Sequence, residues 1–410
     1  MRRIIFFILA FVGLIMACRK TEFQRPPVGE KVPYVETATS DFNTLLERST
    51  QKLFYAAWKR SHIDSLLKSL GSGVRFTILA PDDAAMTAAG FTADKIATAK
   101  VADLDSLLLF HVMSEYVDSA TLIGQQGNVR HKSLLRDRTI KETVTRLGSQ
   151  VPFPEAYAYK LYLGVATDGS LLINGKKSGK ITPVYARNGV IYPINKPLVR
   201  PNKTVIDVIN TDPRFSILSG LLKAMDSKWE EVSYGWFERN QYAGLGIEGG
   251  DIVSNDAFFA PTNEAFKKAG FNSVEDLMTL NERSMPYLDE DLGEMRNGLF
   301  VTDSLLAYSR WGRMYSPRSS NGGGSGVPAM FWSNDLNNAM LSTFALVTSG
   351  SNAVPIYFMT LDFGTNGEQI TVKVKGSSHA AANIVEADIP TLQGPFHAVD
   401  NLILSDKVKF

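Results

Sequence analysis

The sequence predicts a chain of mixed helices and strands that is built from two related copies. Residues 80–91 and 260–271 carry Ala, Pro, Ala, Ala, Gly and Phe in identical register, 180 residues apart. In each copy an apolar, strand-like run precedes the motif and a helix-like stretch follows it. This spacing is too long for the repeat of a solenoid, and it suits a duplicated domain.

The elements of the first copy follow from its apolar spacing and its capping residues. Residues 41–70 place apolar side chains at the spacing of one buried helix face, and residues 74–79 form an apolar run typical of a strand. Residues 81–83 (Pro-Asp-Asp) suit the first turn of a helix, where proline is tolerated and carboxylates face the positive end of the helix dipole. Gly90 suits the end of that helix, with Phe91 folding back onto it. Folding alone therefore explains the repeated motif, and we assign no catalysis to it.

Further pairs of segments continue the repeat beyond this motif. The spacing between the copies grows from 180 to 205 residues, so the second copy must carry insertions, which we place at about 227–252 and 313–356. The further pairs are 105–112 with 303–310, 171–175 with 370–376, and 188–195 with 393–400. The middle pair consists of strand-like runs, each of which ends in a turn signal.

This order of segments resembles the fasciclin domain family, twice over. The second copy is the closer match, through residues 258–266 (FFAPTNEAF), residues 397–400 (HAVD) and the opening helix pair that starts at residue 204. The resemblance implies an α+β fold of two tandem fasciclin-like domains, 38–200 and 201–410, each a β-wedge or sandwich packed with helices. It also implies a role in adhesion and extracellular binding rather than in catalysis.

The N-terminus predicts export and a lipid anchor. Arg2 and Arg3 precede the apolar run 4–17, which is too short to cross a bilayer comfortably and reads as a signal peptide, residues 1–17. The run ends at Cys18 and resembles the lipobox of bacterial lipoproteins, in which this cysteine is lipidated. An ordinary signal peptide that happens to contain a cysteine is the alternative. Cys18 is the only cysteine, so no intrachain disulfide forms, and residues 18–37 are expected to be the lipidated cysteine with a polar, Pro-containing tether.

The resemblance extends to lipoproteins of Bacteroidetes-type bacteria, which accompany outer-membrane glycan-uptake systems. We therefore expect a protein anchored to the outer membrane by lipid, on either the cell-surface or the periplasmic face. The expected partners are the membrane and a glycan or an envelope or surface protein. A net charge of +1 argues against a nucleic-acid partner.

Two groups of residues are candidates for binding. The first group matches a Tyr-His pair that, in animal members of the family, is associated with integrin-type adhesion. The matching pairs here are Phe110-His111 and Tyr308-Ser309, so neither copy keeps both residues, and we do not expect an integrin as partner. The second group surrounds a Gly-rich run in the later insertion, where aromatic side chains form either a stacking platform for sugars or proteins or the packing of the insertion onto its domain. The candidates are Phe110 with His111, Tyr308 with Ser309, and Trp311, Tyr315, Phe331 and Trp332.

No motif for a metal, cofactor or catalytic centre is present in the sequence. There is no HExxH, no phosphate-cradling glycine loop and no cluster of Cys and His at ligand spacing. Residues 289–291 with Glu294 form the densest acidic group, which we expect on a solvated helix face. The histidines His111 and His397 are expected to be structural. We therefore predict a non-catalytic binding or adhesion lipoprotein, with a polysaccharide-acting enzyme or a periplasm-facing scaffold as the alternatives.

Overall fold

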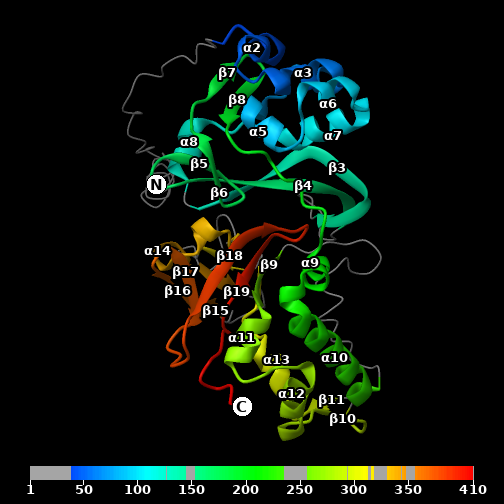
Figure 1. Cartoon of the computed structure of the whole chain (residues 1–410), viewed down its shortest axis with the longest axis vertical. Coiled ribbons are helices and arrows are strands. Elements are labelled where there is room, and N and C mark those ends of the chain that lie inside the picture. Colours follow the sequence, from blue (N-terminus) through cyan, green and yellow to red (C-terminus); the bar gives the residue numbers. More distant parts are fainter. Residues whose placement is uncertain are drawn as a thin grey trace, which may run out of the picture. The chain divides into compact units, whose positions relative to one another are not determined.

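The computed structural model describes residues 38–125, 127–144, 153–234, 256–292, 294–312, 315–317, 330–342, 344–347 and 356–409 (Figure 1). Residues 40–410 form one compact unit. The predicted signal peptide, Cys18 and the tether fall outside the described residues, as do parts of both predicted insertions. Among the helices that are described, none is long and apolar enough to cross a membrane.

The first domain opens with three short helices over the range predicted to be helical. They are α2 (Phe42–Arg48), α3 (Lys52–Arg60) and α4 (Ile63–Ser69). Asp41 caps α2 by accepting a hydrogen bond from the Thr44 N–H at 3.0 Å, which satisfies one free donor of the first turn. The apolar faces of these helices enter one hydrophobic cluster with the helix α7 (Val101–His111).

An eight-stranded sheet forms the rest of this domain, in the order β6-β5-β4-β3-β2-β1-β8-β7. β1 and β8 pair in parallel, and the other neighbours are antiparallel. A turn with positive φ at Asn174 and Gly175 joins β5 to β6, as the predicted Asn-Gly turn requires. The strands are β1 (Phe76–Pro81), β2 (Val112–Met113), β3 (Val129–Val144), β4 (Phe153–Val165), β5 (Ser170–Ile173), β6 (Lys176–Lys180), β7 (Val184–Ala186) and β8 (Gly189–Ile194).

The repeated motif folds largely as predicted, with one correction at its start. Pro81 is the last residue of β1 and does not open the helix α5 (Asp83–Ala88). Asp82 is the cap instead, and its carboxylate accepts from the Ala85 N–H at 2.7 Å. Gly90 has a φ of +83°, and the Phe91 N–H donates to the Met86 carbonyl at 2.9 Å, which closes the helix end. The helices α6 (Ala93–Thr98), α7 and α8 (Ser119–Gly124) follow.

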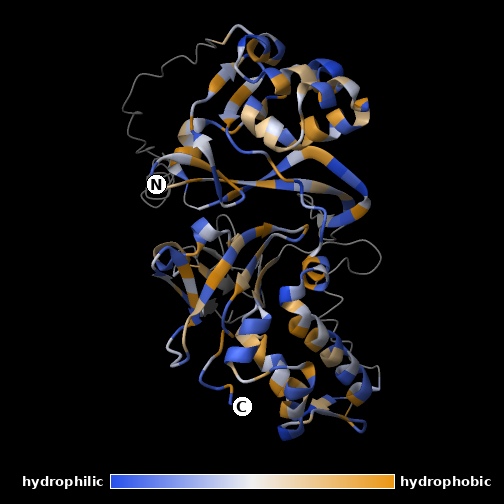
Figure 2. Cartoon of the chain, viewed as in Figure 1, coloured by the Kyte–Doolittle hydropathy of each residue, from blue (hydrophilic) through white to orange (hydrophobic). Residues whose placement is uncertain are grey.

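The second domain opens with helices and closes on a six-stranded sheet, ordered β12-β9-β19-β18-β17-β16. Apolar and polar positions alternate along its longest helix, α10, so that one face is buried (Figure 2). Its helical elements are α9 (Val205–Thr211), η1 (Pro213–Phe215), α10 (Ser216–Ser233), α11 (Asn263–Lys268), α12 (Val274–Met278), η3 (Thr279–Arg283), α13 (Val301–Leu305), η4 (Ser333–Asp335) and α14 (Asn338–Leu341). Its strands are β9 (Asp256–Pro261), β10 (Tyr287–Asp289), β11 (Glu294–Arg296), β12 (Arg310–Gly312), β13 (Tyr315–Pro317), β14 (Phe344–Val347), β15 (Ile356–Phe358), β16 (Leu361–Asn366), β17 (Gln369–Val374), β18 (Ala382–Pro390) and β19 (Pro395–Val399).

One expectation for this domain was wrong. The acidic group at 289–291 and Glu294 does not lie on a helix face. It belongs to a two-stranded hairpin of β10 and β11, in which Asp289 pairs with Glu294 across the strands and Arg296 lies 3.4 Å from the Asp289 carboxylate. The sequence has a glycine within this acidic run, at position 293, and glycine disfavours a continuous helix.

Strand pairing shows that the two domains share one plan. β1 pairs in parallel with β8 in the first, and β9 pairs in parallel with β19 in the second. Each central strand is flanked on its other side by a short antiparallel strand, β2 or β12. The register also agrees, because Leu79 faces Tyr192 and Phe259 faces His397. The sequence repeat is therefore a repeat of structure.

Candidate binding site

The first predicted pair, Phe110 and His111, ends α7 and lies inside the first domain. The His111 side chain is buried, and its Nδ1 lies 2.8 Å from the Leu107 carbonyl oxygen, to which it donates. Burial lowers the pKa of His111 to about 4, so the ring is neutral at physiological pH. Phe110 is also buried and meets Tyr159 edge to face, with ring centroids 6.1 Å apart. His111 thus packs the core, whereas Phe110 also lines a pocket.

The second pair, Tyr308 and Ser309, precedes the edge strand β12. Tyr308 is half-buried, and its ring stacks on Trp311 with centroids 6.4 Å apart. Ser309 is buried, and its carbonyl accepts from the Phe259 N–H at 2.8 Å. The two predicted pairs therefore lie in different local structures, one at a helix end and the other at the edge of a sheet.

The aromatic side chains around the later insertion pack inward. Trp311, Phe331 and Trp332 are buried, at 7%, 0% and 2% exposure. Trp311 donates its indole N–H to the Tyr308 carbonyl at 2.6 Å, and its ring lies 6.0 Å from that of Phe331. These three residues form packing, the alternative to an exposed stacking platform. Tyr315 lies in β13, and its side chain is outside the described residues.

Trp332 also belongs to a segment that contacts the β3–β4 hairpin of the first domain. Its ring lies 5.2 Å from the ring of Tyr162. The Asn128 backbone N–H donates to Asp335 Oδ1 at 2.9 Å, and its side-chain amide donates to Asn334 Oδ1 at 2.8 Å. These residues are more than 200 positions apart in the chain, so no local pattern in the sequence signalled the contact.

Asp335 is the most unusual acid of this contact. It is 1% exposed, and burial, followed by a smaller repulsion from Asp388, raises its pKa to about 6. Its second oxygen and the side-chain oxygen of Asn128 are buried without a hydrogen-bond partner among the described residues. A proton on Asp335 would supply a donor to this oxygen-rich group, so we expect the contact to respond to pH.

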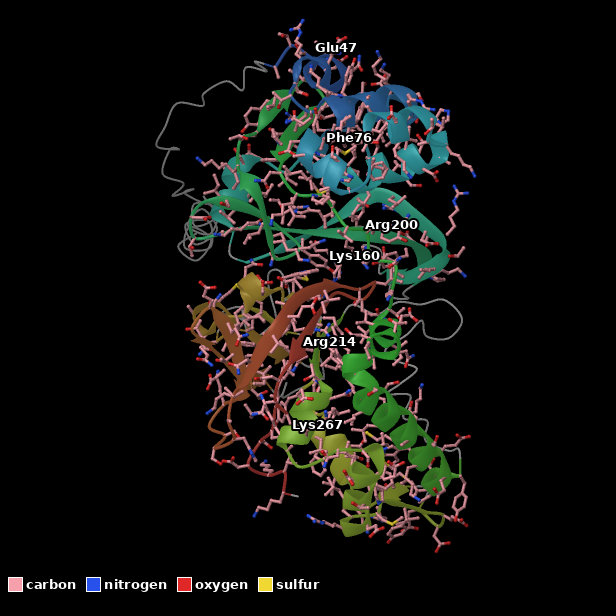
Figure 3. All side chains as sticks on the ribbon, viewed as in Figure 1. Glu47, Phe76, Lys160, Arg200, Arg214 and Lys267 are labelled. Atoms are coloured by element: carbon pink, nitrogen blue, oxygen red, sulfur yellow. The ribbon has the colours of Figure 1, made fainter. Side chains whose placement is uncertain are left out.

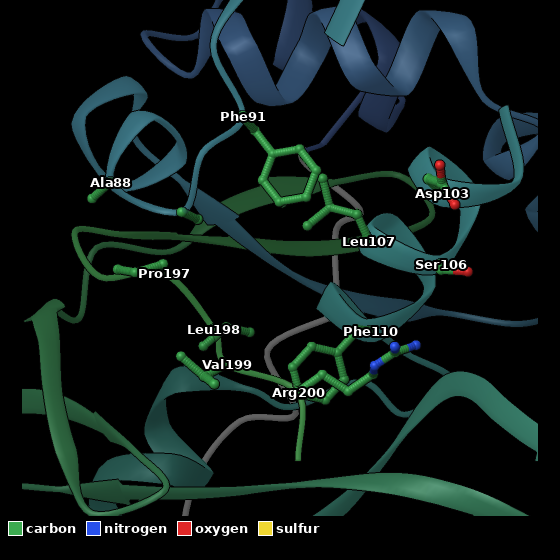
Figure 4. A pocket seen from close by; sticks show the side chains of 11 residues that line it. Ala88, Phe91, Asp103, Ser106, Leu107, Phe110, Pro197, Leu198, Val199 and Arg200 are labelled. Atoms are coloured by element: carbon green, nitrogen blue, oxygen red, sulfur yellow. The ribbon is translucent and has the colours of Figure 1, made fainter. Parts of the chain in front are cut away.

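A pocket of about 500 Å³ opens on the first domain, beside Phe110 (Figure 4). It lies between α5, α7 and the extended segment 197–200 that follows β8. Most of its lining is apolar. The lining residues are Ala88, Ala89, Phe91, Asp103, Ser106, Leu107, Phe110, Pro197, Leu198, Val199 and Arg200.

The polar groups of the pocket gather on one side. Asp103 and Ser106 lie at the right of the view, Pro197 lies at the left, and Arg200 lies beside Phe110 with its guanidinium directed to the right (Figure 4). Arg200 is exposed and is labelled on the first domain in Figure 3. Its guanidinium carbon lies 5.5 Å from the centre of the Tyr159 ring on β4. The family resemblance points to Phe110, whereas segment 197–200 has no periodic pattern in the sequence that would indicate a site.

The described residues hold no group of three or more His, Cys, Asp or Glu side chains that could bind a metal ion. The His397 side chain makes hydrogen bonds within the protein through both ring nitrogens. Its Nδ1 accepts from the Asp388 N–H at 3.3 Å, and its Nε2 donates to the Phe331 carbonyl at 2.8 Å. Burial lowers its pKa, so the ring is neutral. Such a ring, enclosed and bonded at both nitrogens, orients its neighbours.

Comparison with known proteins defines the class of the first domain. Residues 49–200 match the family model of the Fasciclin domain. The repeated strand pairing extends this plan to the second half, so the chain has an α+β fold of two tandem fasciclin-like domains.

One solved structure among those found is a FAS1 domain pair from the insect cell adhesion molecule Fasciclin I. The match has 12% identity, covers 88% of this chain and 100% of that chain, and has a TM-score of 0.27, too low to support a shared arrangement. No curated protein matches the sequence.

Proposed function

We propose that this protein is a non-catalytic, membrane-anchored lipoprotein that binds ligands or surfaces outside the cytoplasm. The observation that carries the proposal is the fasciclin domain at 49–200, whose strand plan recurs in the second half of the chain. Domains of this kind serve adhesion and binding, and a tandem pair offers two surfaces to partners.

The anchor in this proposal is a lipid on Cys18. The support is the sequence alone: two arginines, a short apolar run, and the only cysteine of the chain at its end. More than one acyl chain on this residue holds a protein at a membrane, whereas a single chain is marginal. The polar tether 18–37 then separates the first domain from the outer membrane, and the Bacteroidetes-type resemblance favours a glycan or an uptake complex as partner.

The alternative of a polysaccharide-acting enzyme receives no support from the described residues. Such an enzyme would use carboxylates of the second domain, of which Asp289, Asp291 and Glu294 form the densest group. They lie on the short β10–β11 hairpin, and Asp289 is engaged by Arg296. A periplasm-facing scaffold has the same fold and anchor as the leading proposal. It differs only in the face of the membrane that carries the protein.

Two measurements, one on fractionated cells and one on intact cells, test the proposal. The Cys18→Ala variant of the full chain should move from the membrane to the soluble fraction, and its retention at the membrane would remove the lipid anchor. Protease treatment of intact cells should destroy an epitope in residues 201–410. An epitope that is protected until lysis would point to the periplasmic scaffold.

Binding itself is tested with residues 38–410, which include the compact unit and all four hydrophobic clusters of the described residues. Labelled protein is mixed with isolated outer membranes, with purified surface glycans and with extracellular matrix. Saturable binding to one of them supports the proposal. Absence of binding to all three, by a protein with a cooperative unfolding transition, contradicts it.

A further inference from the structure

We propose that the first-domain pocket binds a single-chain amphiphile with an anionic headgroup, such as a fatty carboxylate. The apolar chain lies against Phe91, Leu107 and Leu198, and the headgroup meets the guanidinium of Arg200. This inference deepens the proposed binding function and rests on it.

The size and lining of the pocket suit an apolar chain. Its volume of about 500 Å³ falls within the range of ~300–1,000 Å³ that is usual for small-molecule sites. Phe91, Leu107 and Leu198 are only partly buried, so their apolar surface is open to the pocket. Val199 at its rim is 63% exposed, which is a large exposure for valine. A bound chain would remove this surface from water.

Arg200 supplies the charge. Among the described residues no carboxylate lies within ion-pair distance of its guanidinium. The contact with the ring of Tyr159, at 5.5 Å, holds the flat group beside the pocket. An arginine fork matches a carboxylate with two parallel hydrogen bonds, which a compact ammonium group cannot do.

The other two polar residues of the pocket have roles within their own helix. Asp103 is the third residue of α7, where a carboxylate is stabilised by the positive end of the helix dipole. The Ser106 hydroxyl donates to the Ala102 carbonyl at 2.9 Å in the same helix. Arg200 has no such role in a helix or strand, because it lies in the extended segment after β8. The charge left for a ligand is therefore positive, and the ligand is an anion.

The test measures binding of dodecanoate, below its micelle concentration, to residues 38–410 by titration calorimetry. Dodecyltrimethylammonium, with the same chain and a positive headgroup, is the charge control. Vesicles of phosphatidylglycerol and of phosphatidylcholine show whether a membrane lipid supplies the same chemistry. We expect saturable binding of one dodecanoate per chain and at least about tenfold weaker binding of the cation.

Variants locate the site. Arg200→Gln should weaken dodecanoate binding about tenfold, because the charged hydrogen bonds are lost. Lys196→Gln removes another exposed positive charge, four residues earlier and outside the lining, and should change affinity less than about twofold. Asp103→Asn should tighten binding by about two- to threefold, since it removes a negative charge from the rim.

A filling variant tests the apolar part. Ala88→Trp places a large ring in the pocket and should abolish binding, whereas Ala84→Trp, also exposed on α5 but outside the lining, should not. Circular dichroism and thermal unfolding check that each variant folds.

Three outcomes decide the inference. Dodecanoate binding that is lost in Ala88→Trp and weakened in Arg200→Gln supports it. Vesicle binding with the same sensitivities, in the absence of dodecanoate binding, also supports the site and assigns a membrane lipid as the source. No saturable binding of either probe, or binding that ignores both variants, overturns it. If outer membranes or glycans still bind in that case, only this inference fails and the proposed function stands.

Discussion

The two domains place different polar side chains at one equivalent position. Tyr192 in β8 and His397 in β19 occupy the same register beside the central strand of each domain. The Tyr192 hydroxyl donates to the Val117 carbonyl, and His397 Nε2 lies by the Phe331 carbonyl, both at 2.8 Å. A phenol and an imidazole have different reactivity and share the ability to donate one hydrogen bond. The feature that the two domains share at this position is therefore a buried hydrogen-bond donor, and not a reactive group.

The largest expected effect tests the glycine that begins β8. An added Cβ at Gly189 would meet the Phe76 carbonyl oxygen at 1.9 Å, and φ there is +150°. Gly189→Ala should lower the free energy of unfolding by about 3 kcal/mol or more, measured by urea denaturation. Gly73→Ala, with open space around it, is the control and should stay within about 1 kcal/mol. Gly394 has a φ of +156° at the matching place, so an equal loss in Gly394→Ala would extend the comparison to the second domain.

The second test removes the hydrogen-bond donor at the equivalent position of each domain. His397→Ala leaves a cavity and an unsatisfied Phe331 carbonyl, and should destabilise the protein by about 3 kcal/mol. Tyr192→Phe removes only the hydroxyl and should cost about 1 kcal/mol. Both values come from chemical denaturation near neutral pH. No loss of stability in one of the two variants would show that the donor role is not shared.

The third test concerns acid sensitivity in the first domain. The folded-state pKa of His111 is lowered from 6.5 to about 4, so the unfolded chain takes up a proton first as the pH falls. Stability from this group should fall between about pH 6.5 and about pH 4, by about 2 kcal/mol. His111→Gln should reduce that fall in unfolding measurements at about pH 7 and about pH 4. An unchanged slope would mean that His111 is accessible to protons in the folded protein.

The fourth test concerns the contact at Asp335, where stability should change with pH in the opposite direction. The folded-state pKa of Asp335 is raised from 3.8 to about 6, so the folded protein binds the proton more tightly. Its contribution to stability should therefore fall as the pH rises from about 4 to about 6 and remain low above that range. Asp335→Asn should remove this dependence and raise the free energy of unfolding at about pH 7 by about 1–2 kcal/mol.

The chain has five tryptophans, so the emission lost in a Trp332→Phe variant isolates the signal of Trp332, which packs on Tyr162, and reports whether the contact itself changes. A pH dependence that is the same with Asn at position 335 would assign the effect to a group other than Asp335.

The sequence predicted what depends on neighbouring residues. The positive φ of Gly90, the Asn174-Gly175 turn and the paired positions of Tyr192 and His397 were all accessible from the repeat, because local chemistry decides them. The Pro81-Asp82 pattern predicts a helix start, whereas Pro81 still pairs with Ile194 of β8 as the last residue of β1 and Asp82 is the helix cap.

Contacts across long distances in the sequence were beyond prediction. Nothing near Asn128 signals that Asp335 will meet it, and nothing near Phe110 signals that Arg200 will share its pocket. Burial also decides between the two roles expected for the aromatic residues of the later insertion. A tryptophan such as Trp332 looks the same in a sequence whether it lies on a surface or in a core, and here it is buried. Exposure is decided by the whole fold.

The hydrophobic core of the first domain includes a residue from near the end of the chain. Leu392 belongs to a hydrophobic cluster otherwise made of first-domain residues, and its carbonyl accepts from the buried Tyr157 hydroxyl at 2.8 Å. During synthesis, which proceeds from the N-terminus, Tyr157 is made more than 200 residues before this partner. A nascent chain therefore carries an incomplete core through most of its production, and a premature stop before Leu392 would leave that core open for quality-control proteases to recognise.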